Sequence, residues 1–122
     1  MEEILIADDE KIVRTPLRMA LEKANYSVTE ATNGVEILDI LNSKHIDLLI
    51  LDMAMPEKSG METLMDIQKG HANLKIVVMT GAIDIHQKTF SRFVKQYHIK
   101  DVLEKPFDLE LFLAVVKKAL RN

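Results

Sequence analysis

Three carboxylates in this sequence have the type and placement that metal and phosphate chemistry require. Asp8 and Asp9 follow the apolar run 4–7, and Asp52 follows the apolar run 48–51. Carboxylates that lie close together repel one another unless a cation joins them. Mg²⁺ suits this place, because it takes hard oxygen ligands and needs only one or two carboxylates beside water and phosphate oxygens. The acidic group therefore predicts a magnesium site.

Two later residues could complete such a site. Thr80 follows the apolar run 76–79, and Lys105 follows the run 101–103. A lysine can pair with a carboxylate or a phosphoryl oxygen as a compact charge, and a threonine hydroxyl can donate to the same oxygens. Taken singly, the aspartates could be turn formers, the threonine a helix cap and the lysine a surface residue. Their combination indicates a site.

The elements that position these residues alternate along the chain. Short apolar runs predict strands at 4–7, 28–30, 48–51, 76–79 and 101–103, and amphipathic stretches between them predict helices. The helical stripes include Leu17 and Leu21, Val35 and Leu41, Met61, Leu64 and Met65, Phe93 and Tyr97, and Leu109 and Phe112 after an N-cap at Asp108.

This alternation predicts an α/β fold, a doubly wound five-stranded parallel sheet with helices on both faces. In the flavodoxin-like strand order 2-1-3-4-5, the first and third strands are neighbours, and ligands bind at the carboxyl ends of the strands. Asp8, Asp9 and Asp52 should then converge at one edge of the sheet, with Thr80 and Lys105 directed to the same edge.

Composition excludes several other classes of function. The 122 residues suffice for one domain, 1–122, with no separate output domain expected. A net charge of -3 argues against direct nucleic-acid binding, and the absence of cysteine excludes disulfides and thiolate metal sites. No secretory signal or long apolar run is present, so no membrane association and a cytoplasmic location are the default expectations. The four histidines show no metal-ligand spacing, and no glycine-rich loop suggests a nucleotide site.

Four motifs, each after a predicted strand, together resemble the receiver domain of two-component response regulators. They are Asp8-Asp9-Glu10, the run 52–56 with Gly60, Thr80-Gly81-Ala82, and Lys105-Pro106-Phe107. The resemblance covers essentially the whole chain. It implies a phosphoacceptor signalling domain rather than an enzyme, with self-catalysed phosphotransfer and dephosphorylation only.

The resemblance also assigns roles to individual residues. It implies that Asp52 is the phosphoacceptor, and that Asp9, Asp52 and the main-chain carbonyl of Ala54 ligate Mg²⁺, with Asp8 acting through water. Thr80 would contact the phosphoryl group, and Lys105 would hold Asp52 or its phosphoryl oxygens. The remaining implied positions are Gly81, where the backbone approaches the phosphoryl group, and Pro106, the family's cis-proline.

The implied partners are a histidine kinase or a histidine phosphotransfer protein, which presents phosphohistidine, and an unknown downstream protein target. Dimerisation is left open. On phosphorylation, Thr80 would draw the loop 81–87 with it. Two alternatives remain: a Mg²⁺-dependent phosphatase with an aspartyl-phosphate intermediate, and a receiver-like adaptor that is not phosphorylated. The first would need a second aspartate where Ala54 stands.

Three departures from the family pattern concern the expected output face. Val102 occupies the position, three before the lysine, where an aromatic switch residue is common. The segment 80–105 is about three residues longer than usual, and His98-Ile99 replaces a common Gly-Ala pair. These departures leave the expected phosphorylation chemistry intact.

Overall fold

The computed structural model describes residues 1–55, 60–81 and 88–121, with the backbone alone at 88–90. Within these ranges, five strands alternate with five helices. The elements are β1 (Glu3–Ala7), α1 (Lys11–Lys23), β2 (Ser27–Ala31), α2 (Gly34–Ser43), β3 (Leu48–Asp52), α3 (Gly60–Gly70), β4 (Lys75–Thr80), α4 (Lys88–Gln96), β5 (Ile99–Glu104) and α5 (Leu109–Arg121).

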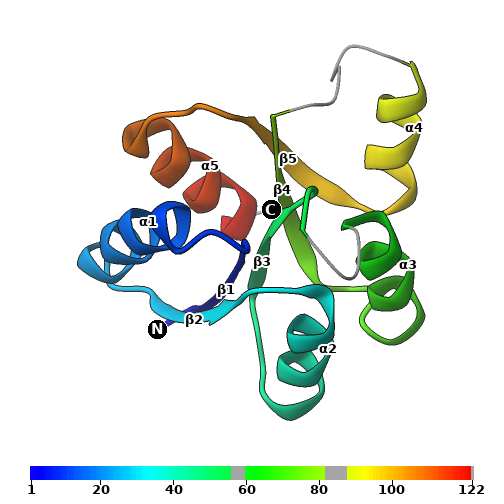
Figure 1. The fold of residues 1–122 in the computed structure, drawn as a ribbon, viewed down its shortest axis with the longest axis horizontal. Coiled ribbons are helices and arrows are strands. Elements are labelled where there is room, and N and C mark those ends of the chain that lie inside the picture. The colour runs from blue at the N-terminus through cyan, green and yellow to red at the C-terminus, as the bar shows by residue number, and fades with distance from the viewer. Residues whose placement is uncertain (56–59, 82–87, 122) are drawn as a thin grey trace.

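The strands form one parallel sheet in the order β2-β1-β3-β4-β5, which confirms the predicted topology. Figure 1 shows α1 and α5 on one face of this sheet and α2, α3 and α4 on the other. The fold is therefore the flavodoxin-like doubly wound arrangement, and the carboxyl ends of β1, β3, β4 and β5 meet at one edge.

The central strands read as unbroken apolar runs because both of their faces are covered. All five residues of β3 are buried. Side chains alternate between two cores: Leu49 packs with α2, α3 and α4, whereas Leu48 and Ile50 pack with α1 and α5. This two-sided burial holds the strand ends in place and so makes a rigid base for the polar edge.

The buried faces of three helices differ from the predicted stripes. Val35, Met61, Met65 and Leu109 are exposed, although the apolar pattern placed them inward. The side chains that are buried instead include Ile37 in α2 and Ile67 in α3. Single apolar residues commonly remain on a protein surface, so the pattern located each helix without fixing its rotation about its axis.

The entry into β5 has an unusual backbone conformation. His98 adopts a φ of 56°, in the left-handed region that glycine occupies without strain, at one of the two positions where the sequence departs from the family's Gly-Ala pair. β5 begins at Ile99, two residues before the predicted start, and its pairing with β4 shifts register between Ile76 and Val77. At the next helix, the Asp108 carboxylate accepts a hydrogen bond from the Leu111 amide at 2.7 Å, as predicted for an N-cap.

None of the helices in the described ranges combines the length and apolar character needed to cross a bilayer.

Candidate metal and phosphoryl site

The register of the sheet brings the two buried aspartates together. Ala7 of β1 pairs with Leu51 of β3, so Asp8, directly after β1, comes beside Asp52. Asp52 is the last residue of β3, and Thr80 is likewise the last residue of β4, rather than the first residue after each strand. Asp8, Asp52 and Thr80 are all buried.

Lys105 joins the two carboxylates. Its Nζ donates a hydrogen bond to Asp8 Oδ2 at 3.1 Å and lies 3.5 Å from Asp52 Oδ1. Its main-chain amide donates to the Thr80 carbonyl at 2.8 Å, and the Lys105–Pro106 peptide bond is cis, as the resemblance implies. The expected convergence of Asp8, Asp52 and Lys105 is therefore confirmed. Their chemical roles remain predictions.

The turn after β1 presents further acidic oxygens. Asp8 Oδ1 accepts a hydrogen bond from the Glu10 amide at 2.9 Å. One carboxylate oxygen each from Asp8, Asp9 and Glu10 lies within 4.8 Å of the others, and both Asp9 and Glu10 are exposed. Glu10 belongs to the motif quoted from the sequence, but its carboxylate was given no role there.

Burial and charge set the protonation of the pocket. Burial raises the pKa of Asp52 above its usual value and the charge of Asp8 adds to the rise, against the Ala54 amide and Lys105, which lower it. For Lys105, burial by itself lowers the pKa, but its hydrogen bond with Asp8 and the charges of Asp52 and Asp8 outweigh burial and raise it. The lysine thus stays charged beside more than one anion.

This donor set fits a magnesium ion. First, its oxygens come from carboxylates. Second, its negative charge is not balanced, because the single ammonium of Lys105 offsets only one of the two buried anions and Asp9 adds a third, exposed carboxylate. A small divalent cation that keeps several waters meets both conditions. The residues present therefore suit Mg²⁺ by chemistry as well as by position.

The loop after β3 packs tightly against the site. The Ala54 amide donates to Asp52 Oδ1 at 3.1 Å, which places the Ala54 backbone beside the carboxylate. The Gly60 amide approaches the Met53 carbonyl at 3.4 Å, and a Cβ on Gly60 would lie 2.7 Å from Met53 Cα. Glycine is thus required where α3 begins, because the loop backbone passes so close. Pro56 of the quoted motif lies outside the described residues.

Three other positions singled out in the sequence are Gly81, Val102 and Ala82. Gly81 is exposed, and a Cβ there would stand 3.7 Å from Lys105 Cβ, in ordinary contact distance. Val102 is half-buried and packs against the core beneath α4. Ala82 and the rest of the loop predicted to move with Thr80 lie outside the described residues.

Sequence reasoning missed an ion-pair cluster beneath the acidic turn. Arg14 on α1 donates from one terminal nitrogen to the Asp8 main-chain carbonyl at 2.8 Å and from Nε to Glu30 on β2 at 2.8 Å. No spacing rule relates a residue of α1 to one of β2, so the sequence carried no signal for this contact.

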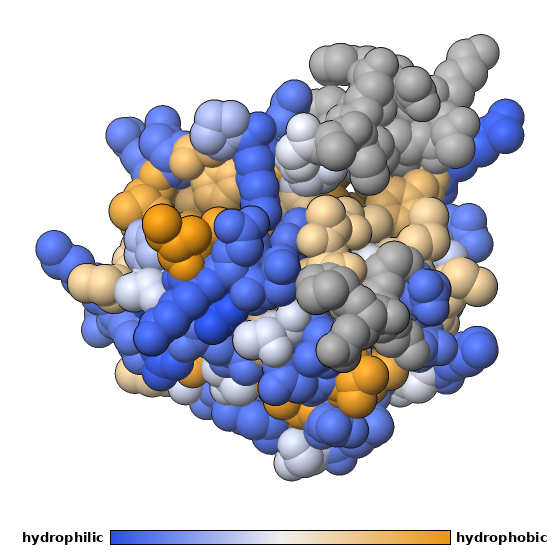
Figure 2. Space-filling model, in the orientation of Figure 1, coloured by the Kyte–Doolittle hydropathy of each residue, from blue (hydrophilic) through white to orange (hydrophobic). Residues whose placement is uncertain are grey.

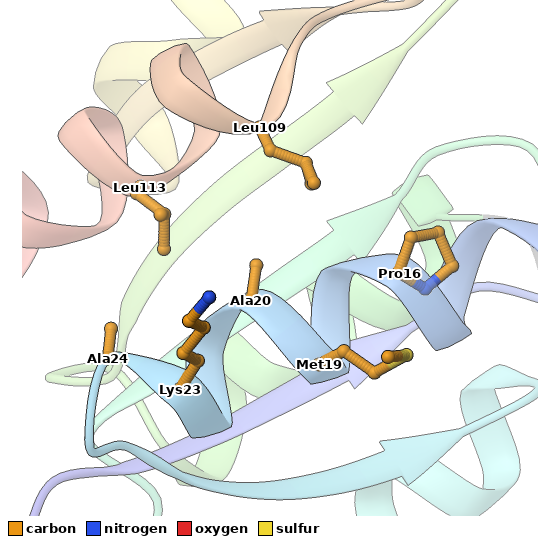
Figure 3. A pocket seen from close by; sticks show the side chains of 7 residues that line it. All are labelled: Pro16, Met19, Ala20, Lys23, Ala24, Leu109 and Leu113. Carbon is orange, nitrogen blue, oxygen red and sulfur yellow. The ribbon is translucent and has the colours of Figure 1, made fainter.

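An apolar groove lies between α1 and α5. Figure 2 shows apolar residues gathered where α1 and α5 lie side by side. Figure 3 shows the groove between them, lined by Pro16, Met19, Ala20 and Lys23 from α1, by Ala24 at the end of that helix, and by Leu109 and Leu113 from α5. It encloses about 510 Å³, and a second groove that shares Pro16 and Leu109 extends to Lys105 and Pro106.

The sequence is similar to those of known response regulators and of a phosphotransferase. The chain is 36% identical over 119 residues to the response regulator MprA of Mycobacterium avium, which covers 98% of this chain and 51% of that protein. It is 33% identical over 121 residues to the sporulation initiation phosphotransferase F of Bacillus subtilis, covering 98% of this chain and 94% of that one. The chain thus spans about half the length of the MprA relatives that it matches.

Solved structures of response regulators also resemble this chain. The response regulator TrrA of Thermotoga maritima, in complex with Mg²⁺-BeF, superposes with a TM-score of 0.80 at 30% identity, covering 98% of this chain and 99% of that one. A receiver domain from Methanospirillum hungatei gives a TM-score of 0.89 at 24% identity, with 99% and 94% covered, and supports the fold alone. The family model of the response regulator receiver domain matches residues 4–117. The chain belongs to the receiver domain family of two-component response regulators.

Proposed function

We propose that Asp52 accepts a phosphoryl group from the phosphohistidine of a histidine kinase or histidine phosphotransfer protein, in a Mg²⁺-dependent reaction that switches protein contacts. The observation that carries this proposal is the position of Lys105, whose Nζ lies 3.1 Å from Asp8 and 3.5 Å from Asp52 in an otherwise buried acidic pocket. An ammonium held there can neutralise oxygens that enter the pocket on a phosphoryl group.

The two oxygens of Asp52 have different surroundings. The Ala54 amide and the Lys105 ammonium both engage Oδ1. Within the described ranges this leaves Oδ2 for bond formation. In the proposed step, a bond forms between Oδ2 and phosphorus while the bond from phosphorus to the histidine nitrogen breaks, and its electron pair stays on the imidazole. Phosphoryl transfer depends mainly on positioning and charge stabilisation, which these fixed contacts supply.

The proposed metal ligands are Asp9, Asp52 and the carbonyl of Ala54, with Asp8 acting through water. Bound Mg²⁺ would supply neutralisation of the phosphoryl oxygens in the transition state. The Mg²⁺-BeF complex of the TrrA relative supports this choice of ion. Asp8 is fixed by hydrogen bonds to Glu10 and Lys105, so it serves as an oriented acceptor for a metal-bound water.

The proposed switch residues follow the same edge of the sheet. Thr80 ends β4 next to Lys105, and its hydroxyl would contact the phosphoryl group once that group is in place. Because Val102 carries no ring, the output would differ from the usual aromatic reporting of the family. Phosphorylation shifts the equilibrium between two conformations of the protein only as far as it stabilises one of them more than the other. That difference in free energy limits the change in partner binding.

One experiment tests the proposal directly. The protein is incubated with Mg²⁺ and a small acyl phosphate or phosphoramidate, and its intact mass is measured. We expect a gain of one phosphoryl group in the wild type and in Asp39→Asn, which changes an exposed aspartate of α2, but none in Asp52→Asn. A phosphorylated Asp52→Asn protein would refute the assignment. Sustained release of phosphate from an ester substrate would instead favour the phosphatase alternative.

A further inference from the structure

Arg14 is an unusually buried cation that the chemistry above does not use. Its side chain is 12% exposed, against 39% for its neighbour Arg18 on the same helix. The Arg14 guanidinium makes two short contacts, to the main-chain carbonyl of Asp8 and to Glu30 Oε1, both at 2.8 Å. Such a fork holds its partners in a fixed relative orientation, which a lysine could not do.

Glu30 is itself locked. Its second oxygen, Oε2, accepts a hydrogen bond from Arg18 at 2.7 Å, so each carboxylate oxygen has a guanidinium of its own. Glu30 lies on β2 directly beside Ile6 of β1. The position of the Arg14 fork is therefore defined by the sheet rather than by α1 alone.

The backbone of Asp8 is consequently held from both sides. Its amide donates to the Ala31 carbonyl at 3.1 Å, and its carbonyl accepts from Arg14. That carbonyl belongs to the peptide plane shared with Asp9, and the peptide group is rigid. Fixing it sets the positions of the Asp9 nitrogen and Cα, from which the exposed Asp9 side chain leaves the chain.

We propose that Arg14, anchored by Glu30, is a positioning residue that preorganises Asp9 for a divalent cation. This inference rests on the proposed function, because it assigns Arg14 a role in the metal site of that reaction. Removing a residue that hydrogen-bonds to a metal ligand and orients it typically weakens metal binding by about 10- to 100-fold. Without Arg14, the turn at residues 8–10 would have to be ordered by the ion itself, and binding would weaken.

The rival explanation is that Arg14 only ties α1 to β2. A tie of that kind would lower the melting temperature but leave the metal affinity of the folded protein unchanged. The two explanations therefore separate when affinity is measured well below the melting temperature. Arg18 offers a matched control, because it contacts the same Glu30 but not the Asp8 carbonyl.

The test is a Mg²⁺ titration of Arg14→Gln, Arg18→Gln and Glu30→Gln, followed by amide chemical shifts, with a thermal melt of each variant. We expect the dissociation constant to rise by about tenfold in Arg14→Gln and by less in Glu30→Gln. In Arg18→Gln, an exposed pair is lost and the constant should stay within about twofold of wild type.

The outcomes decide between the explanations. Unchanged affinity in a folded Arg14→Gln protein would overturn the positioning role while leaving Asp52 phosphorylation intact. If Arg14→Gln does not fold, Glu30→Gln decides in the same way, since it keeps Arg14 but removes its anchor. A wild type that binds no Mg²⁺ would overturn both this role and the proposed function, whereas wild-type binding with weakened Arg14→Gln binding supports the role.

Discussion

Replacing Lys105 with methionine removes the charge between the two buried carboxylates and keeps most of the side-chain volume. In the folded protein, Lys105 Nζ lies 3.1 Å from Asp8 and 3.5 Å from Asp52, and the Asp52 side chain is only 4% exposed. The variant would leave two anions side by side in a place that water scarcely reaches.

The distances give a scale for the effect. At an effective dielectric constant of about 20, each of these contacts corresponds to about 5 kcal/mol of attraction before any desolvation is counted. Removing one partner of a buried ion pair destabilises proteins by about 3–5 kcal/mol. The Lys105 side chain is 25% exposed, so water can partly solvate the two carboxylates in the variant. We therefore expect a loss of about 2–3 kcal/mol in the free energy of unfolding. For a domain of 122 residues, this corresponds to a fall in melting temperature of roughly 8–12 °C.

The assay compares thermal unfolding of wild type, Lys105→Met and the surface control Lys117→Met, with Mg²⁺ and with chelator. Lys117 is exposed on α5, so its variant should stay within about 0.5 kcal/mol of wild type. Since a bound divalent ion stabilises only the folded state, Mg²⁺ should raise the melting temperature of Lys105→Met more than that of the wild type.

Two results would refute this reasoning. A loss below about 1 kcal/mol in chelator would show that the buried carboxylates tolerate each other without the lysine, against the measured behaviour of broken buried pairs. An equal Mg²⁺ shift in both proteins would show that the ion and the ammonium do not neutralise the same oxygens.

Three further predictions concern single positions. Asp52→Asn should be more stable than wild type in chelator near neutral pH, because a carboxyl whose folded pKa is raised opposes folding above that pKa. Urea titrations should show this gain in stability vanishing as the pH falls towards 3.8, the usual pKa of an aspartate. Gly60→Ala should destabilise by about 2–3 kcal/mol, because its Cβ would meet the Met53 backbone, whereas Gly70→Ala, with nothing within 4 Å, should be neutral or stabilising in the same denaturation assay. His98→Gly should raise the free energy of unfolding by about 0.5–1 kcal/mol by relieving a positive φ; a decrease would show that the imidazole makes a stabilising contact.

The sequence predicted the central sheet well because its strands are buried on both faces. Unbroken apolar runs located β1, β3 and β4 to within one residue at each end. The helices were harder, since their rotation depends on neighbours that the pattern does not contain. The predicted stripe of α3 was Met61, Leu64 and Met65. Leu64 faces the core as predicted, together with Ile67, but Met61 and Met65 are exposed.

The site shows the same contrast. The strand-end rule was sufficient to bring Asp8, Asp52 and Lys105 together, because a parallel sheet directs all carboxyl ends to one edge. The contact of Arg14 with Glu30 and the Asp8 carbonyl could not be foreseen, because it depends on sheet twist and on the reach of long side chains. The φ of His98 is intermediate: the replacement of a Gly-Ala pair marked the place, but only the structure shows the conformation.

The ion pair between Asp8 and Lys105 spans 97 positions of the chain, and β5 is an outermost strand of the sheet. A polypeptide emerging from the ribosome therefore makes its anionic half-site long before the cation that balances it. Until β5 docks, closing the anionic pocket is electrostatically opposed, and docking brings in the ammonium that balances one of its buried carboxylates. Completion of the sheet and arrival of the balancing charge thus coincide, so a chain without β5 lacks the ammonium that pairs with Asp8.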